Sequence, residues 1–370
     1  MRTLFARIHA ISIPLPEEFV MTTARKDLVD VEVTRYYHCI SRCVRQAYLC
    51  GESFEYRKQW IEDRLELLAK NFSISVAGFA VMDNHMHVLC RLDPKEADSW
   101  SAEEVLRRWL AIYPPRNVSI DDPEAVAMWV TRRSQDHKQV EIYRARLQNL
   151  GWFMKSLKEP LARRANREDQ CKGSFWEARF KSIAVLDEEA LLATCAYIDL
   201  NPLAAGQATV PEQAEYTSVR QRVAHVRQQG QLTRLSAAKR GSVAASQAAG
   251  NIDQDHWLLP IEDRRQHTNA QPASKREGML DSFSLGSYLL LVDYTGRLFR
   301  TGKARIDDGV NEIFQRFGTS QEIWGDRMKK MLSSRALYGR FFAADRIKLT
   351  ALAQRRGQHH LANLSPQLAS

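Results

Sequence analysis

The stretch from Gly78 to Arg91 constrains the fold more than any other part of the chain. Two apolar runs flank Asp83-Asn84, a pair typical of a tight turn. The run after the turn suits a buried strand, in which successive side chains alternate between two faces. His85 and His87 are therefore predicted to project together. Two imidazoles on one strand face suit a single metal ion, although histidines at this spacing also occur in cores and on surfaces.

A second pattern, over residues 187–200, predicts a helix with acidic residues in its first turn and Pro202 at its end. Tyr197 and Asn201 are four residues apart, so they share one face of that helix. The two side chains are then presented together to a metal held by the histidines. The residues alone also allow Tyr197 to pack in the core and Asn201 to cap the helix before the proline.

The order of the motifs along the chain carries a resemblance. A strand at residues 36–42 and a helix precede Met82-Asp83-Asn84-His85-Met86-His87. Basic helices, the segment 173–180 and Tyr197-Ile198-Asp199-Leu200-Asn201-Pro202 follow. Over residues 31–205 this order resembles the single-tyrosine transposases of the HUH superfamily, and within them the REP-associated tyrosine transposases. The resemblance implies an α+β fold, with a ferredoxin-like antiparallel sheet and packed helices (the HUH endonuclease fold).

The resemblance also implies a reaction and a set of roles. Tyr197 matches the nucleophile that attacks a DNA phosphate, leaving a 5′-phosphotyrosine and a free 3′-OH. A phenol has a pKa of about 10 and is a poor nucleophile at neutral pH unless it is activated. His85 and His87 match the metal-ligand pair, and Asn201 matches the third ligand. Mixed imidazole and oxygen ligation suits Mg²⁺ or Mn²⁺, and ligand softness alone leaves Zn²⁺ open.

The charge distribution agrees with a DNA partner. The chain has 53 Lys and Arg against 44 Asp and Glu, and residues 131–181 hold 13 basic and 6 acidic side chains. Cations follow phosphates, and interleaved aromatic rings can stack on unpaired bases. The alternative is a solvated basic helix face over an apolar core stripe. The residues expected to contact single-stranded or hairpin DNA are Lys155, Lys158, Arg163, Arg164, Arg179 and Lys181.

Composition shifts divide the chain of 370 residues into four parts. Residues 1–30 are expected to form a disordered N-terminal extension. Residues 31–225 are the predicted catalytic domain, with an insertion near 114–138 rich in turn-forming residues. Residues 226–277 have the composition of a linker, and residues 278–370 form a predicted, mainly helical C-terminal accessory domain.

Several classes of protein are disfavoured by the sequence. There is no run of about 18 apolar residues, so no membrane partner is expected. Six cysteines without a Cys-x-x-Cys pair predict neither a zinc ribbon nor a redox motif. We expect a bacterial cytoplasmic, nucleoid-associated protein that acts as a monomer or homodimer.

Two alternatives to a transposase stay open. One is a domesticated or catalytically silent hairpin-DNA-binding protein, which would need the basic helices but not the histidines and tyrosine. The other is an HUH nickase of the replication or conjugation type. The presence of all four site residues favours an enzyme, and the wording of the two motifs favours the transposase group.

Overall fold

The computed structural model describes most of the chain between residues 29 and 333. The described residues are 29–228, 256–263, 265, 277–281, 283–301, 308–316 and 318–333. The predicted N-terminal extension up to residue 28, most of the predicted linker and residues 334–370 lie outside this part. In the described residues, no helix is both long and apolar enough to cross a membrane.

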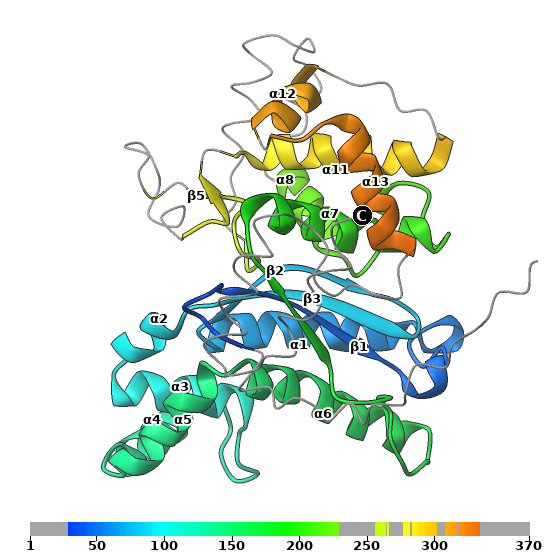
Figure 1. Ribbon diagram of the computed structural model, residues 1–370. Coiled ribbons are helices and arrows are strands. Elements are labelled where there is room, and N and C mark those ends of the chain that lie inside the picture. The colour runs from blue at the N-terminus through cyan, green and yellow to red at the C-terminus, as the bar shows by residue number, and fades with distance from the viewer. Residues whose placement is uncertain are drawn as a thin grey trace, which may run out of the picture.

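A four-stranded antiparallel sheet lies at the centre of the molecule (Figure 1). Its strands, in the spatial order β2-β3-β1-β4, are β2 (Ile74–Val81), β3 (His85–Leu92), β1 (Tyr36–Arg42) and β4 (Lys181–Val185). In the sheet, β3 lies between β1 and β2 and is antiparallel to both. It therefore separates the two parallel strands that a helix connects, as in ferredoxin-like sheets. The predicted α+β class with an antiparallel sheet is confirmed.

One face of the sheet is covered by helices from the first half of the chain (Figure 1). They are α1 (Tyr56–Asn71), α3 (Ala102–Ile112), α4 (Pro123–Ser134), α5 (His137–Leu147) and α6 (Leu150–Glu168), with the short α2 (Pro94–Ser99) beside them. Alternate strand residues such as Cys39, Phe79, Val88 and Cys90 are fully buried against this layer. Burial of so much apolar surface is the main stabilising contribution on this side.

The opposite face of the sheet is covered by later helices (Figure 1). Helices α7 (Glu188–Ala204) and α8 (Ser218–Gln228) pack on the sheet, and α11 (Leu285–Thr301), α12 (Asp308–Arg316) and α13 (Gln321–Ser333) lie outside them. The last three belong to the predicted accessory domain, yet they share one hydrophobic core with α7 and α8. A Cβ added at Gly296 of α11 would lie 3.2 Å from Leu200 of α7, so the absence of a side chain permits this close approach.

The described part of the predicted linker is also packed. Leu258 and Leu259 are buried, and the Leu259 backbone N–H donates to the carbonyl of Val76 in β2. Two short strands, β5 (Glu262–Asp263) and β6 (Leu280–Asp281), then pair in parallel. The segment 256–263 is therefore a fixed element that runs beside the sheet.

Two element boundaries differ from the expectation. Pro202 does not end the tyrosine helix, because α7 continues to Ala204. A proline near the end of a helix removes a single N–H donor, and the carbonyl of Asn201 still accepts from Ala205. The sequence pattern predicts a strand over residues 175–186, and the strand β4 begins only at Lys181.

Candidate active site

The pairing of β1 with β3 gathers polar side chains on the face of the sheet that α7 covers. His85 lies opposite Arg42 and His87 lies opposite Ile40, with His38 two residues further along β1. Directly paired residues, and residues two apart, point to the same face of a sheet. The register therefore places three histidines and one arginine together, whereas their neighbours Cys39 and Val88 face the opposite layer.

His87 is the centre of the site. Its Nδ1 lies 2.9 Å from Nε2 of His38, and its Nε2 lies 3.2 Å from Nδ2 of Asn201. Both histidines are buried, with 3% and 2% of their surfaces exposed. Both ring nitrogens of His87 are thus engaged, one by the first strand and one by the tyrosine helix.

Tyr197 lies against the same imidazoles. Its ring centroid is 5.4 Å from that of His87 and 6.0 Å from that of His38, with edge-to-face geometry in both contacts. The side chain of Asn201 lies near the Tyr197 hydroxyl and favours its ionised form. The four-residue spacing on α7 thus brings tyrosine and amide to one point, as predicted.

Burial decides the protonation of the tyrosine. It raises the pKa of Tyr197 above the ordinary phenol value, and the Asn201 side chain and the nearby Arg42 charge oppose this rise only partly. The free site therefore holds a protonated phenol at neutral pH. A positive charge placed beside the hydroxyl would favour the phenolate.

Burial also holds the histidines uncharged. It lowers the pKa of His38 to about 3 and that of His85 to about 4, with Arg42 contributing at His85. The pKa of His87 is lowered further below its ordinary value by burial and by its neighbours His38 and His85. Neutral imidazoles keep the lone pair that a metal ligand needs, so the set is ready for a cation at neutral pH.

The turn before β3 is fixed by two side chains from outside it. Lys58 forms an ion pair with Asp83 at 2.8 Å, and Gln207 donates to the same carboxylate at 2.6 Å. Asn84 lies beside His85, with Oδ1 at 2.6 Å from Nδ1 of the imidazole. His85 is half-buried, and its ring centroid is 5.0 Å from that of His87. The turn therefore orients the more accessible of the two predicted ligands.

The tyrosine helix is fixed from its other side. Asp187 caps its N-terminus by accepting from the N–H of Ala190. Asp199 lies between Tyr197 and Asn201 in the sequence. Its side chain is buried and points away from the site. It accepts from the N–H of Val219 at 2.9 Å and from the hydroxyls of Ser218 and Tyr288. Helices α8 and α11 thereby set the position of α7 over the histidines.

The residues present fit a divalent cation of moderate hardness. His85, His87 and Asn201 offer two neutral imidazoles and an amide, and a half-turn of the amide presents its oxygen in place of Nδ2. Within the described residues, no group of three or more His, Cys, Asp or Glu side chains is arranged as a metal site. The candidate set differs from such groups because its third member, Asn201, is an amide.

The predicted DNA contacts divide between the two sides of the sheet. Lys155, Lys158, Arg163 and Arg164 lie on α6, in the layer opposite the histidines. Lys155 and Arg163 pair with Glu159, Lys158 donates to the carbonyl of Ala178, and Arg164 stacks 3.6 Å over the Trp60 ring. Arg179 is exposed just before β4. Lys181 of β4 pairs with Ile40 of β1 and so belongs to the histidine face.

Two residues of the site were missed from the sequence. His38 and Arg42 alternate along β1 in the same way as His85 and His87 along β3. Arg42 is exposed, and within the described part of the chain it has no carboxylate partner. The alternation was readable in the sequence, but the register that places these residues opposite the histidines was not.

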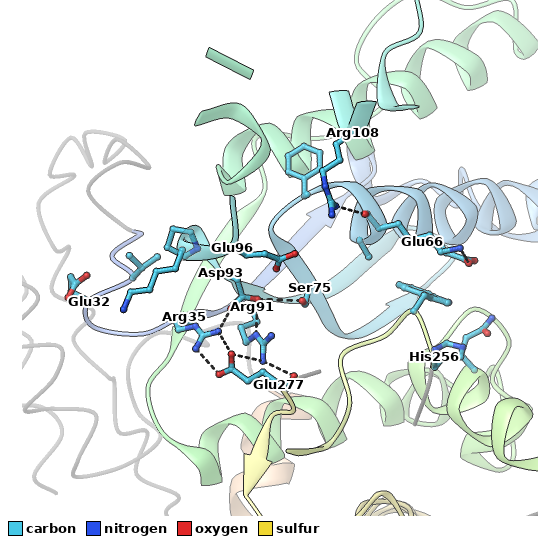
Figure 2. Close-up of a pocket in the computed structure, with 18 residues that line it drawn as sticks. Glu32, Arg35, Glu66, Ser75, Arg91, Asp93, Glu96, Arg108, His256 and Glu277 are labelled. Atoms are coloured by element: carbon cyan, nitrogen blue, oxygen red, sulfur yellow. Dashed lines mark hydrogen bonds and ion pairs between the residues drawn. The ribbon is translucent and has the colours of Figure 1, made fainter. Parts of the chain in front are cut away.

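A large pocket lies at the other end of β3 (Figure 2). Its volume is about 1200 Å³, and it is lined by residues of β2, β3, α1, α2, α3 and α8, by the segment just before β1, and by Trp257 and Glu277. Figure 2 shows Arg35 and Arg91 bonded to Asp93 and Glu277. These charges are satisfied among themselves and tie residue 277 to the sheet. The pocket is therefore separate from the histidine site.

Comparisons with known proteins are sparse. No family model and no curated protein matches the chain. A solved structure of a REP-associated tyrosine transposase bound to a REP hairpin is similar with a TM-score of 0.30 and 12% identity, over 51% of this chain and 78% of that one.

Proposed function

We propose that the protein is a metal-dependent transposase or endonuclease of the HUH type, acting on single-stranded DNA near hairpins. One observation carries the proposal: Tyr197 and Asn201 of α7 meet His87 of β3 on one face of the sheet. The two helix residues lie more than a hundred positions after His87 in sequence, and the motif resemblance singles out the same three residues. Each has a part in one phosphodiester cleavage.

Tyr197 is the proposed nucleophile. Its phenolic oxygen forms a bond to the phosphorus while the bond from phosphorus to the 3′-oxygen breaks. The downstream strand is left as a 5′-phosphotyrosine, and the departing 3′-oxygen takes up a proton. Because the ester bond is exchanged rather than hydrolysed, a second 3′-OH can reverse the step and rejoin strands.

His85, His87 and Asn201 would hold the divalent cation, Mg²⁺ or Mn²⁺. Such an ion polarises the scissile phosphate and stabilises the charge that develops on its oxygens. Asn201 contacts His87 and lies beside the Tyr197 hydroxyl, so it links the nucleophile to the ligand set. Arg42 and Lys181, on the same face, supply positive charge where the phosphate would enter.

The test uses single-stranded oligonucleotides that cover palindromes flanking the gene, incubated with Mn²⁺ or Mg²⁺. A 3′-labelled strand should become linked to the protein in a band stable to denaturant, whereas a 5′-labelled strand should be released. Tyr197→Phe removes only the hydroxyl and should abolish the band.

The matched control is Tyr48→Phe. Tyr48 is 60% exposed and, among the tyrosines that the structure describes, is the most open to an unspecific reaction. This variant should form the adduct at the normal rate. An adduct that survives Tyr197→Phe would show that another residue carries the chemistry.

A further inference from the structure

A third histidine contacts the site without belonging to the proposed ligand set. His38 is almost completely buried on β1, and its Nε2 lies 2.9 Å from Nδ1 of His87. Two neutral imidazoles at this distance share one proton, so one ring donates and the other accepts. Which ring donates determines whether the other nitrogen of His87 carries a proton.

Asn201 decides between the two arrangements. Its Nδ2 lies 3.2 Å from Nε2 of His87, and an amide nitrogen is a donor only. With the amide in this orientation, the Nε2 atom accepts, so the proton of His87 is on Nδ1 and is donated to His38. This tautomer directs the lone pair of Nε2 toward the amide and Tyr197.

We infer that His38 is a positioning residue that holds His87 in the tautomer whose Nε2 lone pair faces the tyrosine helix. The inference deepens the proposed function and rests on it for the identity of the cation. Metal-binding histidines usually donate their second N–H to a neighbouring acceptor, which fixes the ring and its tautomer. A carboxylate is a common acceptor, and here a neutral imidazole takes that place.

The neutrality of the acceptor suits the proposed substrate. A carboxylate at residue 38 would add negative charge beside a site that is to receive a phosphodiester. The buried imidazole of His38 gives the same hydrogen bond without that charge, so it does not neutralise Arg42, four residues along the strand. The site therefore keeps a net attraction for phosphate.

The first measurement needs neither DNA nor metal. In protein labelled with ¹⁵N-histidine, two-bond ¹H–¹⁵N correlation spectra report which ring nitrogen carries the proton, and the spectrum of His87→Gln identifies the His87 signals. The wild-type protein should show His87 protonated on Nδ1. Protonation on Nε2 in the wild-type protein overturns the inference.

The second measurement compares two variants at residue 38. His38→Gln can offer an amide oxygen to Nδ1 of His87, whereas His38→Phe fills the space and offers no acceptor. Mn²⁺ affinity, followed by the paramagnetic resonance of the free ion, should fall about 10- to 100-fold in the Phe variant and recover in the Gln variant. Wild-type affinity and an unchanged tautomer in folded His38→Phe would also overturn the inference.

The two failures can be told apart. If the wild-type protein binds no Mn²⁺ but His38→Phe moves the proton of His87 to Nε2, the positioning role stands and the proposed metal does not. If neither variant folds, the wild-type spectrum still decides the tautomer. His137→Phe, at an exposed histidine on α5, is the control and should change neither measurement.

Discussion

The two faces of the central sheet are built from the same strands and differ in everything else. On the α1 and α6 side, alternate residues such as Cys39 and Val88 are apolar and fully buried. On the α7 side, their neighbours His38 and His87 are equally buried but bonded to one another and to Asn201. Both faces contribute apolar burial, but the α7 face combines a core that includes Leu89 and Val185 with a buried polar cluster.

The comparison shows how a small sheet can carry a site without losing its core. Polar groups removed from water are costly unless they have partners, and here each imidazole finds one within the cluster. The apolar face and the helices α8 and α11 hold the strands and α7 in place. Changes on one face should therefore affect chemistry, and changes on the other should affect stability.

The largest effect is expected from a pair of adjacent substitutions on β3. His87→Ala removes the central group of the polar face, so covalent adduct formation should fall about a thousandfold or more, because metal-assisted charge stabilisation contributes several kcal/mol. Hairpin binding should remain, since phosphate contacts dominate affinity.

Val88→Ala, one residue later, should instead lower the free energy of unfolding by about 2 kcal/mol and leave adduct formation intact. Denaturant titration and the adduct assay on both variants test the separation. Equal losses of stability in the two variants would contradict it.

The next effect concerns the support of the tyrosine helix. Asp199→Ala leaves the Val219 N–H and the Tyr288 hydroxyl buried without their acceptor, and should lower the free energy of unfolding by about 3 kcal/mol. Tyr288→Phe removes one donor only and should cost about 1 kcal/mol. Urea titrations of both variants check this order. A larger loss in the Phe variant would show that Asp199 does not organise the cluster.

A smaller effect depends on pH and links the two layers. Glu62 of α1 accepts from Gln221 of α8, and burial raises the pKa of its carboxyl to about 7. The folded protein then binds more protons than the unfolded chain between about pH 4.5 and 7. The contribution of this group to stability is thus present at low pH and is lost as pH rises through 7.

Glu62→Gln removes the titration at this position. Stability at pH 8 should rise by an amount on the order of 2 kcal/mol, and the decline between pH 5 and 8 should flatten. Urea titrations at several pH values measure it. The exposed Glu103→Gln variant is the control, and an equal change there would assign the effect to net charge.

The smallest effect is expected on DNA affinity, and it distinguishes predicted DNA contacts on the two sides of the sheet. Lys181 lies on the polar face, whereas Lys155 lies on the opposite layer beside Glu159. Lys181→Ala should weaken binding to a single-stranded hairpin a few-fold and reduce the slope of log affinity against log salt by about 1. Lys155→Ala should change neither. A larger effect at Lys155 would place DNA on the α6 side.

The sequence predicted more of the site than of its surroundings. The pairs His85–His87 and Tyr197–Asn201 follow from strand and helix periodicity, and the structure brings them to one point. Their chemical roles stay predictions. The end of α7 at Pro202 was predicted wrongly, because a local rule on proline ignores the packing that carries the helix to Ala204.

Local periodicity and motif order determined the strands, the tyrosine helix and which of their residues share a face. The tertiary structure decided what those faces meet. The β1–β3 register placed His38 against His87, and the packing of α11 joined the C-terminal helices to the tyrosine helix. Register and packing depend on contacts between residues far apart in the chain, whose free energies no short stretch of sequence contains.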